Sequence, residues 1–165
     1  MSLSLNVGSG DRVYDEYPED SGNRCVNLDK RMEWDRVDIA AHARFIPFKD
    51  ETFDYILASD IIEHFPVKYT GALLKEWSRV LKPDGVIEIK TPNMRWAQDF
   101  YKAGHNAKFI SHHIFGGQDY PGNFHYVMFD REWLNQICNA VGLGEVYYWE
   151  APAHSNFILK VGKIR

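Results

Sequence analysis

The sequence predicts an α/β domain with a mostly parallel sheet. Through the first half of the chain, short apolar runs of strand length alternate with helical or irregular segments, an order that is typical of parallel sheets. Two more strand-like runs near the C-terminal end, residues 145–149 and 157–163, are separated by a connection short enough for an antiparallel hairpin. We therefore expect one sheet whose last strands are antiparallel.

Length and composition favour a single globular domain. The 165 residues are 45% hydrophobic and 15% aromatic, which is well above the content of a disordered chain. The net charge is −4 and no run of basic residues occurs, so a small or weakly charged substrate fits better than a nucleic acid. Cys25 and Cys138 match no metal-binding spacing, and no secretory or membrane-spanning run is found. We therefore expect a cytoplasmic protein with reduced thiols and no membrane partner.

The first two strands are expected at the start of the chain. Residues 5–10 (LNVGSG) form a short strand that leads into a glycine pair, which lets backbone N–H groups approach a ligand, although many such pairs are only tight turns. Residues 11–23 are acidic and contain a proline and a glycine, so no full helix is expected there. Residues 25–29 read as a second strand that ends in Asp29. Such a carboxylate either binds ribose hydroxyls or is simply solvated.

The following elements lead to the centre of the sheet. Residues 37–40 are expected to form a third strand, and residues 53–59 (FDYILAS) the central one, because this run is mostly apolar and bounded by polar residues. Residues 67–81 place apolar side chains at helical spacing and predict an amphipathic helix. A turn at residues 82–85 (KPDG) then leads into a strand at residues 86–91.

The second half of the chain changes character. Residues 94–103 are expected to be helical, whereas residues 104–128 are rich in histidine, glycine and aromatic residues without a clear period. Because the aromatic content argues against disorder, we interpret this irregular segment as a lid or substrate loop. Asp130 is expected to cap a further helix that Gly142 ends. The buried face of that helix is expected to consist of Trp133, Leu134, Ile137, Cys138 and Val141.

Four motifs together resemble those of class I S-adenosylmethionine-dependent methyltransferases, of the broad small-molecule, type 11-like kind. They are residues 5–10 (LNVGSG), 27–29 (NLD), 46–65 (IPFKDETFD through EHF) and 79–85 (RVLKPDG). The resemblance covers nearly the whole chain and implies a Rossmann-like, doubly wound, mostly parallel seven-stranded sheet in the order 3-2-1-4-5-7-6, with a C-terminal antiparallel hairpin. It also implies a single domain over residues 1–165, with residues 94–129 as a substrate or lid insertion.

The resemblance implies methyl transfer from S-adenosylmethionine to an oxygen or nitrogen of a small-molecule or sugar-like acceptor. The residues that it assigns to the cofactor are Gly8, Ser9, Gly10, Asp29, Lys30, His42, Ala43, Ser59 and Asp60. Residues 8–10 would approach the methionine and ribose moieties, Asp29 would hold the ribose hydroxyls, and Ser59 with Asp60 would line the methyl-transfer point. His42 stands where the family usually has an acidic residue beside adenine, and Arg12 stands where a third glycine is common.

The reaction also requires a cover over the site, because methyl transfer depends on holding the acceptor atom near the methyl group and excluding water. Relatives usually carry helices ahead of the first strand that cover the cofactor. This chain has almost nothing there and resembles a short form without that cap. We therefore expect the cover to be residues 104–128, a partner subunit or second copy of the chain, or a region outside this sequence.

An oxygen or nitrogen acceptor often has to lose a proton, and histidine suits this task because its pKa lies near neutrality. The candidate bases are His125, His113 and His112, with His125 first among them. The alternative for each of them is a loop histidine without a catalytic role, whose ring is hydrogen-bonded to a carbonyl group. The same histidines with Asp119 have the right ligand types for a metal. We nevertheless predict no metal site.

Two other functions stay open on the sequence alone. The missing cap, His42 and the shortened first crossover are also consistent with a cofactor-binding, non-catalytic partner protein of the same fold. A dinucleotide oxidoreductase is less consistent, because Val13 stands where a Gly-x-Gly-x-x-Gly fingerprint requires glycine. Our first hypothesis is an enzyme, a methyltransferase that uses S-adenosylmethionine.

Overall fold

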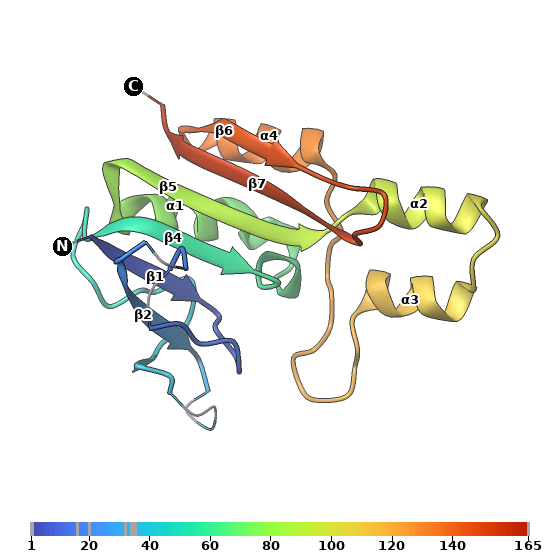
Figure 1. Ribbon diagram of the computed structural model, residues 1–165, viewed down its shortest axis with the longest axis horizontal. Helices are drawn as coiled ribbons and strands as arrows, with labels where there is room; N and C mark the ends of the chain where they lie inside the picture. Colours follow the sequence, from blue (N-terminus) through green and yellow to red (C-terminus); the bar gives the residue numbers. More distant parts are fainter. Residues whose placement is uncertain (1, 16, 20, 32, 34–35, 165) are drawn as a thin grey trace.

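The computed structural model describes residues 2–164 apart from 16, 20, 32 and 34–35. Its strands are β1 (Leu3–Val7), β2 (Arg24–Asp29), β3 (Ile39–Ala40), β4 (Phe53–Ser59), β5 (Leu81–Pro92), β6 (Leu143–Trp149) and β7 (Asn156–Lys163). Within the described residues they form one seven-stranded sheet in the order β3-β2-β1-β4-β5-β7-β6. The neighbours from β3 to β5 are parallel, and β7 runs antiparallel to both β5 and β6. The fold class and strand order that the sequence predicts are confirmed (Figure 1).

The helices fall into two groups. They are α1 (Thr70–Val80), α2 (Met94–Lys102), α3 (Ala107–Phe115) and α4 (Arg131–Ala140), with 3-10 turns η1 (Ile62–His64) and η2 (Val67–Tyr69). Helix α1 packs on β5 and on α4, which in turn packs on β6 and β7. Helices α2 and α3 pack on each other and project beyond the end of β5 (Figure 1). No helix in the described part of the chain is both long and apolar enough to cross a bilayer.

The main core lies between the sheet and the helices α1 and α4. Trp77, Phe53, Phe129 and Phe157 are the largest side chains that are fully buried there. The indole Nε1 of Trp77 donates a hydrogen bond to the Ala43 carbonyl at 3.0 Å, which ties the loop after β3 to α1. A second, smaller core beneath α2 and α3 contains Trp96, Ala97, Ile110 and Met128. The α2–α3 pair therefore has its own packing.

The other face of the sheet carries a polar network. Tyr55, Glu88 and Lys160 alternate with core residues along β4, β5 and β7 and so point away from α1. Glu88 accepts hydrogen bonds from the hydroxyl groups of Tyr17 and Tyr55, and its ion pair with Lys160 is 2.9 Å long. Tyr17 belongs to the crossover of residues 11–23, whose described residues contain no helix, as expected. This irregular crossover covers the sheet in place of a helix.

The predicted turn at residues 82–85 forms a bulge inside β5. Leu81 pairs with Phe53 and Val86 pairs with Tyr55, so the four residues between Leu81 and Val86 face Asp54 alone. Lys82 binds the Asp54 carboxylate, and a Cβ on the fourth residue, Gly85, would lie 2.7 Å from Leu81 Cδ1. Residues 82–85 thus lie inside β5 as a bulge, and β5 is longer than the strand at residues 86–91 that the sequence predicts.

Two predictions in the second half of the chain are wrong. Residues 104–128 are not irregular throughout, since residues 107–115 form α3, which Asn106 caps by accepting a hydrogen bond from the Lys108 backbone N–H. The apolar residues of α3 do not share one face, because Ile110 is buried while Phe109 and Phe115 are about half exposed, and a helical period is therefore hard to see.

The second wrong prediction concerns α4, which Asp130 caps as expected, through a hydrogen bond from the Trp133 backbone N–H. The sequence predicts Trp133 on the buried face of this helix, yet Trp133 is 41% exposed and its ring lies at the edge of the core, 5.2 Å from that of Phe129 between centroids. Leu134 and Cys138 are fully buried as expected, and Ile137 and Val141 pack at the edge of the core.

Candidate active site

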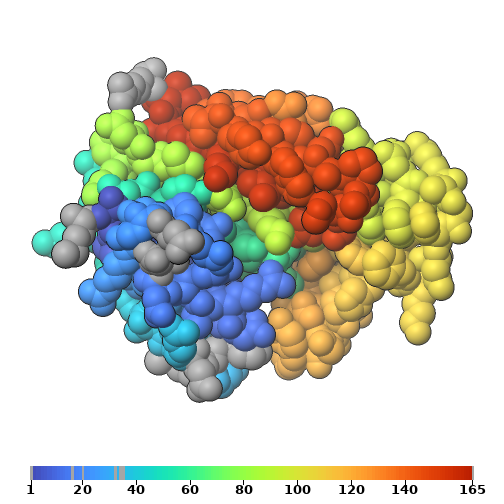
Figure 2. Space-filling view, in the orientation of Figure 1, coloured from blue at the N-terminus to red at the C-terminus, as the bar shows by residue number. Residues whose placement is uncertain are grey.

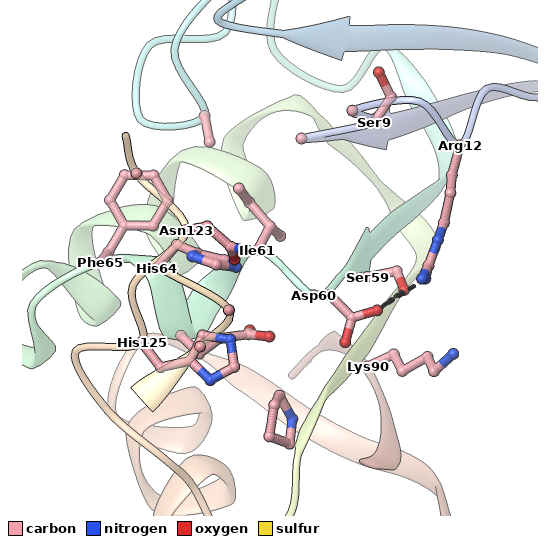
Figure 3. Close-up of a pocket in the computed structure, with 18 of the residues that line it drawn as sticks. Ser9, Arg12, Ser59, Asp60, Ile61, His64, Phe65, Lys90, Asn123 and His125 are labelled. Carbon is pink, nitrogen blue, oxygen red and sulfur yellow. Dashed lines mark hydrogen bonds and ion pairs between the residues drawn. The ribbon is translucent and has the colours of Figure 1, made fainter. Parts of the chain in front are cut away.

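A cavity of about 870 Å³ lies at the carboxyl ends of β1, β2 and β4, where parallel α/β sheets bind their ligands (Figure 3). Every residue that the sequence assigned to the cofactor or to proton transfer lines it: Gly8, Ser9, Gly10, Asp29, Lys30, His42, Ala43, Ser59, Asp60, His112, His113 and His125. The fold therefore brings all of them to one place. Their individual roles stay predictions.

The glycine turn after β1 forms one wall of the cavity. The backbone N–H groups of Gly8 and Ser9 both donate to the Leu28 carbonyl, at 2.8 and 3.0 Å. Gly8 has a φ of +70°, and a Cβ at this position would lie 2.5 Å from Ile61 Cδ1. Gly10 has a φ of +53°, and no atom of the described residues lies within 4 Å of where its Cβ would be. The first glycine is thus required by close packing and the second leaves open space for a ligand.

Asp29 ends β2 next to this turn and is only 7% exposed. Its Oδ2 accepts a hydrogen bond from the Gly10 N–H at 2.9 Å, and its Oδ1 accepts one from the Arg31 N–H, also at 2.9 Å. Each carboxylate oxygen retains a second acceptor site, so the group is held in place without being saturated. Nearby, the hydroxyl of Ser9 is buried and has no hydrogen-bond partner among the described residues. This turn therefore combines an oriented acceptor with an unsatisfied hydroxyl group.

Asp60 follows the central strand β4 and adopts a φ of +53°, which is unusual for a residue other than glycine. Several groups hold its carboxylate. Oδ1 accepts a hydrogen bond from Asn156 Nδ2, while Oδ2 accepts hydrogen bonds from Arg12 at 3.0 Å and from Ser59 at 3.1 Å (Figure 3). Arg12, which replaces the third glycine of the family pattern, thus anchors the residue expected at the methyl-transfer point.

His42 and Ala43 lie at another end of the cavity, after β3. The Nδ1 atom of His42 accepts a hydrogen bond from the Arg44 N–H at 3.1 Å, and partial burial together with the Arg44 charge lowers the pKa of this histidine. Its ring packs against Phe65, with ring centroids 5.5 Å apart. Phe45, the next aromatic residue along the chain, is 69% exposed. His42 is therefore a neutral imidazole beside an exposed aromatic side chain.

Residues 116–126, which we call the cover loop, close the cavity from the side of α3. Figure 2 shows this yellow-to-orange part of the surface beside the blue N-terminal part. The two parts are in contact, because the Arg31 guanidinium lies over the Tyr120 ring, 4.7 Å from its centroid. At its other end, the Tyr126 N–H donates to the Glu63 carbonyl at 2.8 Å, and His64 Nδ1 donates to the Phe124 carbonyl at 3.0 Å. The cover loop is thus held both by the segment that follows β2 and by η1.

The three candidate bases differ in their surroundings. His112 is exposed, and His113 bonds through Nδ1 to the Phe109 carbonyl of its own helix. His125 is half-buried, and its Nδ1 lies 2.9 Å from the His113 carbonyl. Because a carbonyl oxygen only accepts, Nδ1 of His125 carries the hydrogen and Nε2 bears the free lone pair. Burial lowers the pKa of His125, which keeps this imidazole neutral.

Sequence reasoning missed the contact between His125 and the η1 turn. The rings of His64 and His125 meet edge to face, with centroids 4.9 Å apart, and Glu63 lies with them. Glu63 is fully buried, and burial, with the nearby Asp60 charge, raises its pKa to about 8. The available signal was a glutamate inside the apolar run that follows β4. His154, which is exposed, also lines the cavity.

The sequence matches a known protein family over the part that builds this cavity. A profile described as "Methyltransferase domain" matches residues 5–89, slightly more than half of the chain. The chain belongs to the class I S-adenosylmethionine-dependent methyltransferases. The strand order of the sheet agrees with this assignment. The cofactor of this class is S-adenosylmethionine.

The relatives compared with this chain are distant. An uncharacterized protein of Methanocaldococcus jannaschii is 38% identical over 68 residues, which are 41% of this chain but only 29% of that protein. A crystal structure of a protein from Pyrococcus horikoshii matches with a TM-score of 0.73 at 18% identity, over 98% of this chain and 81% of the other.

A second solved structure similar to this chain is the 1,6-didemethyltoxoflavin-N1-methyltransferase of Burkholderia thailandensis, with bound 1,6-didemethyltoxoflavin and S-adenosylhomocysteine. It matches with a TM-score of 0.70 at 16% identity, over 99% of this chain and 72% of the other. At these identities both structures establish the fold of the chain and leave its acceptor open.

Proposed function

We propose that this methyltransferase transfers a methyl group to an oxygen or nitrogen of a small-molecule or sugar-like acceptor. The observation that carries the proposal is that one cavity joins the glycine turn and Asp29 to Asp60 and the cover loop. Its volume of about 870 Å³ suits a nucleoside-containing cofactor together with a small acceptor. The net charge of −4 and the absence of a basic run support a small acceptor rather than a nucleic acid.

One wall of the cavity runs from the glycine turn to Asp60, and we call it the cofactor wall. Its residues fit S-adenosylmethionine. Gly10 leaves its approach open, Ser9 offers an unsatisfied hydroxyl, and Asp29 presents a fixed carboxylate to the ribose hydroxyls. Lys30, His42 and Ala43 continue this wall toward the adenine end. When bound, the cofactor supplies an electrophilic methyl group on a sulfonium. We place Ser59 and Asp60 on the methionine side of this wall.

The cover loop forms the other wall of the cavity, which we call the cover wall. This wall would position the acceptor and exclude water. The cover loop is held at its middle by Arg31 and near its C-terminal end by η1, so it can shield the transfer point from solvent. His125 faces the cavity with Nε2 as its free nitrogen, because Nδ1 is bonded to the His113 carbonyl. We propose that His125 assists the removal of the acceptor proton, ahead of the exposed His112 and of His113. Orientation and water exclusion supply most of the rate in such a displacement.

Binding of the cofactor is the first test. In calorimetric titration, S-adenosylmethionine and S-adenosylhomocysteine should both bind the wild-type chain, and Asp29→Ala should weaken each of them by about 10- to 150-fold, as expected for losing hydrogen bonds to a charged group. Asp99→Ala is the matched control, because Asp99 is an exposed acid on α2 outside the cavity. Failure of the wild-type chain to bind either compound would contradict the proposal, and unchanged affinity in Asp29→Ala would remove the ribose assignment.

A cofactor-binding, non-catalytic partner protein is the second candidate function. It is supported by His42, whose imidazole already accepts the Arg44 N–H and offers no carboxylate to adenine. A panel of hydroxyl- and amine-bearing small molecules, scored by release of S-adenosylhomocysteine, separates the two candidates. Turnover of any member supports the enzyme, whereas cofactor binding without turnover of any of them supports the partner protein.

A second copy of this chain would also complete the cover of the cofactor wall. The proposal is supported by Phe45, which is 69% exposed and lies beside His42 with ring centroids 5.8 Å apart. Light scattering with and without S-adenosylmethionine should then show a dimer that Phe45→Ser disrupts. A monomer under both conditions would contradict the dimer proposal.

We also propose a cytoplasmic location, which is supported by the buried, free thiols of Cys25 and Cys138.

A further inference from the structure

Three potential metal ligands converge on the acceptor side of the cavity. Glu63 and His64 come from η1, and His125 comes from the cover loop. One ligand atom from each residue lies within 4.8 Å of the other two, and all three residues line the cavity. Figure 3 shows His64 and His125 close together, on the far side of Asp60 from Arg12. The set that the sequence pointed to, which included His112, His113 and Asp119, does not converge in this way within the described residues.

Both histidines are oriented as metal-binding histidines usually are. The Nδ1 atom of His64 donates to the Phe124 carbonyl at 3.0 Å, and that of His125 donates to the His113 carbonyl at 2.9 Å. A backbone carbonyl bound to one ring nitrogen fixes the tautomer and leaves the lone pair on the other nitrogen, the arrangement found behind most metal-bound imidazoles. The Nε2 atom of His125 is therefore prepared to act as a ligand, whereas the ring of His64 also has the Gly122 carbonyl as a hydrogen-bond partner, which a bound ion would displace.

The carboxylate of Glu63 is fully buried and only partly satisfied. Its Oε2 accepts a hydrogen bond from Thr91 Oγ1 at 3.0 Å, whereas Oε1 has no partner among the described residues. A buried carboxylate oxygen without a partner is unfavourable unless a cation or a donor completes it. The Thr91 bond also holds the carboxylate in one orientation. The orphaned oxygen is a second observation, independent of the histidines, that points to a bound cation.

We propose that Glu63, His64 and His125 bind one divalent transition-metal ion, of which Zn²⁺ is the best fit, with a coordination position open to the acceptor. Two imidazoles and one carboxylate with an open position are the ligand set of many catalytic zinc sites. Ligand atoms around Zn²⁺ lie about 2.0–2.2 Å from the ion. The three ligand atoms lie within 4.8 Å of one another, so small inward movements of the side chains would bring them to the ion.

The metal proposal deepens the proposed function and rests on it for the acceptor, but not for metal binding itself. An acceptor hydroxyl on the open position would become more acidic and release its proton to solvent. Its oxygen then forms a bond to the methyl carbon as the carbon–sulfur bond breaks, which leaves a neutral thioether and a methylated oxygen. His125 would assist proton removal as a ligand of the ion rather than as a free base. The acceptor class would then be one with a hydroxyl group that can coordinate a metal.

Metal binding can be measured without knowing the acceptor. The protein is stripped with a chelator and titrated with Zn²⁺ by calorimetry and with Co²⁺ by visible absorption, which reports imidazole and carboxylate coordination. The wild-type chain should bind one equivalent of each ion. Glu63→Gln, which keeps the shape of the buried side chain, and His125→Ala should weaken binding by more than about 100-fold, since even indirect partners of a metal ligand contribute 10- to 100-fold. His154→Ala, an exposed cavity residue outside the cluster, should bind as the wild type does.

The outcomes separate the metal site from the proposed function. The metal proposal would be overturned if the wild-type chain bound no ion, or if Glu63→Gln and His125→Ala bound it as tightly as the wild type. Circular dichroism confirms that each variant is folded. Zn²⁺ binding without binding of S-adenosylmethionine would leave the metal site standing and contradict the proposed function. Once an acceptor is found, an unchanged rate after chelation would overturn the activation of the acceptor by the ion.

Discussion

The cavity has two walls that are built in different ways. The cofactor wall, from the glycine turn to Asp60, consists of residues at the ends of strands that are buried in the main core. The cover wall is a loop between two helices, and hydrogen bonds to η1 and one cation–π contact hold it, beside the small core beneath α2 and α3. The first wall is thus fixed by strand pairing, whereas the second depends on a few contacts.

This difference suggests a division of labour between the walls. The sheet can hold the same cofactor in any member of the family, because the register of parallel strands sets where each strand ends. A loop that contributes no residue to the main core can change without disturbing that register. We therefore expect the cofactor wall to govern stability and cofactor affinity, and the cover wall to govern the acceptor. Each prediction below tests one side of this comparison.

The largest expected effect is at Gly8. Its positive φ and the short distance to Ile61 mean that Gly8→Ala combines backbone strain with a clash, and we expect a loss of about 2–4 kcal/mol of unfolding free energy. Gly10→Ala has the same kind of strain without a clash within the described residues and should lose about 1 kcal/mol. Urea denaturation measures both.

A double-mutant cycle with Ile61→Ala isolates the clash at Gly8. Shortening Ile61 removes the two atoms that a Cβ would approach most closely, so the Gly8→Ala loss should fall to that of Gly10→Ala. If Gly8→Ala and Gly10→Ala lose the same unfolding free energy in the chain that keeps Ile61, the cofactor wall is less tightly packed than the structure implies.

How far the sequence predicts each wall follows from the same difference. The glycine turn and Asp29 were predictable, because a strand end followed by glycines, and a second strand ending in a carboxylate, are local patterns. The cluster of Glu63 and His125 was not, because these residues are far apart in the chain and meet only through the cover loop. Helix α3 was missed because its apolar side chains do not form one stripe. Local patterns predict strand ends, whereas tertiary contacts decide the cover.

An intermediate effect is expected at Glu88, on the sheet that supports the cofactor wall. Burial alone would raise the pKa of Glu88, but the hydrogen bonds from Tyr55 and Lys160, with that from Tyr17, outweigh it and hold this pKa below its ordinary value. Because the folded-state pKa is lowered, the folded state binds fewer protons than the unfolded state. The stabilisation is thus complete above the ordinary value of about 4.3 and is lost as the pH falls through the folded-state value.

Glu88→Gln should remove this stabilisation and lose about 1–2 kcal/mol near neutral pH, with a smaller difference from the wild type in acid. Urea denaturation at neutral and acidic pH measures the difference. Glu132→Gln is the matched control, because Glu132 is exposed on α4 and its pair with Arg95 is solvated. A difference between Glu88→Gln and the wild type that grows toward low pH would contradict the sign.

The smallest effect on stability is expected at Tyr120, where the cover loop meets Arg31. Tyr120→Ala removes an exposed cation–π contact and should lose about 0.5–1 kcal/mol at most. The loop itself should respond more than the whole molecule, because this contact holds the middle of the loop, away from its hydrogen bonds to η1. Hydrogen exchange should therefore show faster exchange of the backbone N–H groups of residues 116–123, while β1 and β4 keep their protection. Tyr101→Ala, an exposed aromatic on α2 outside the cavity, is the control. Equal exchange in Tyr120→Ala and Tyr101→Ala would mean that the cover loop is held from η1 alone.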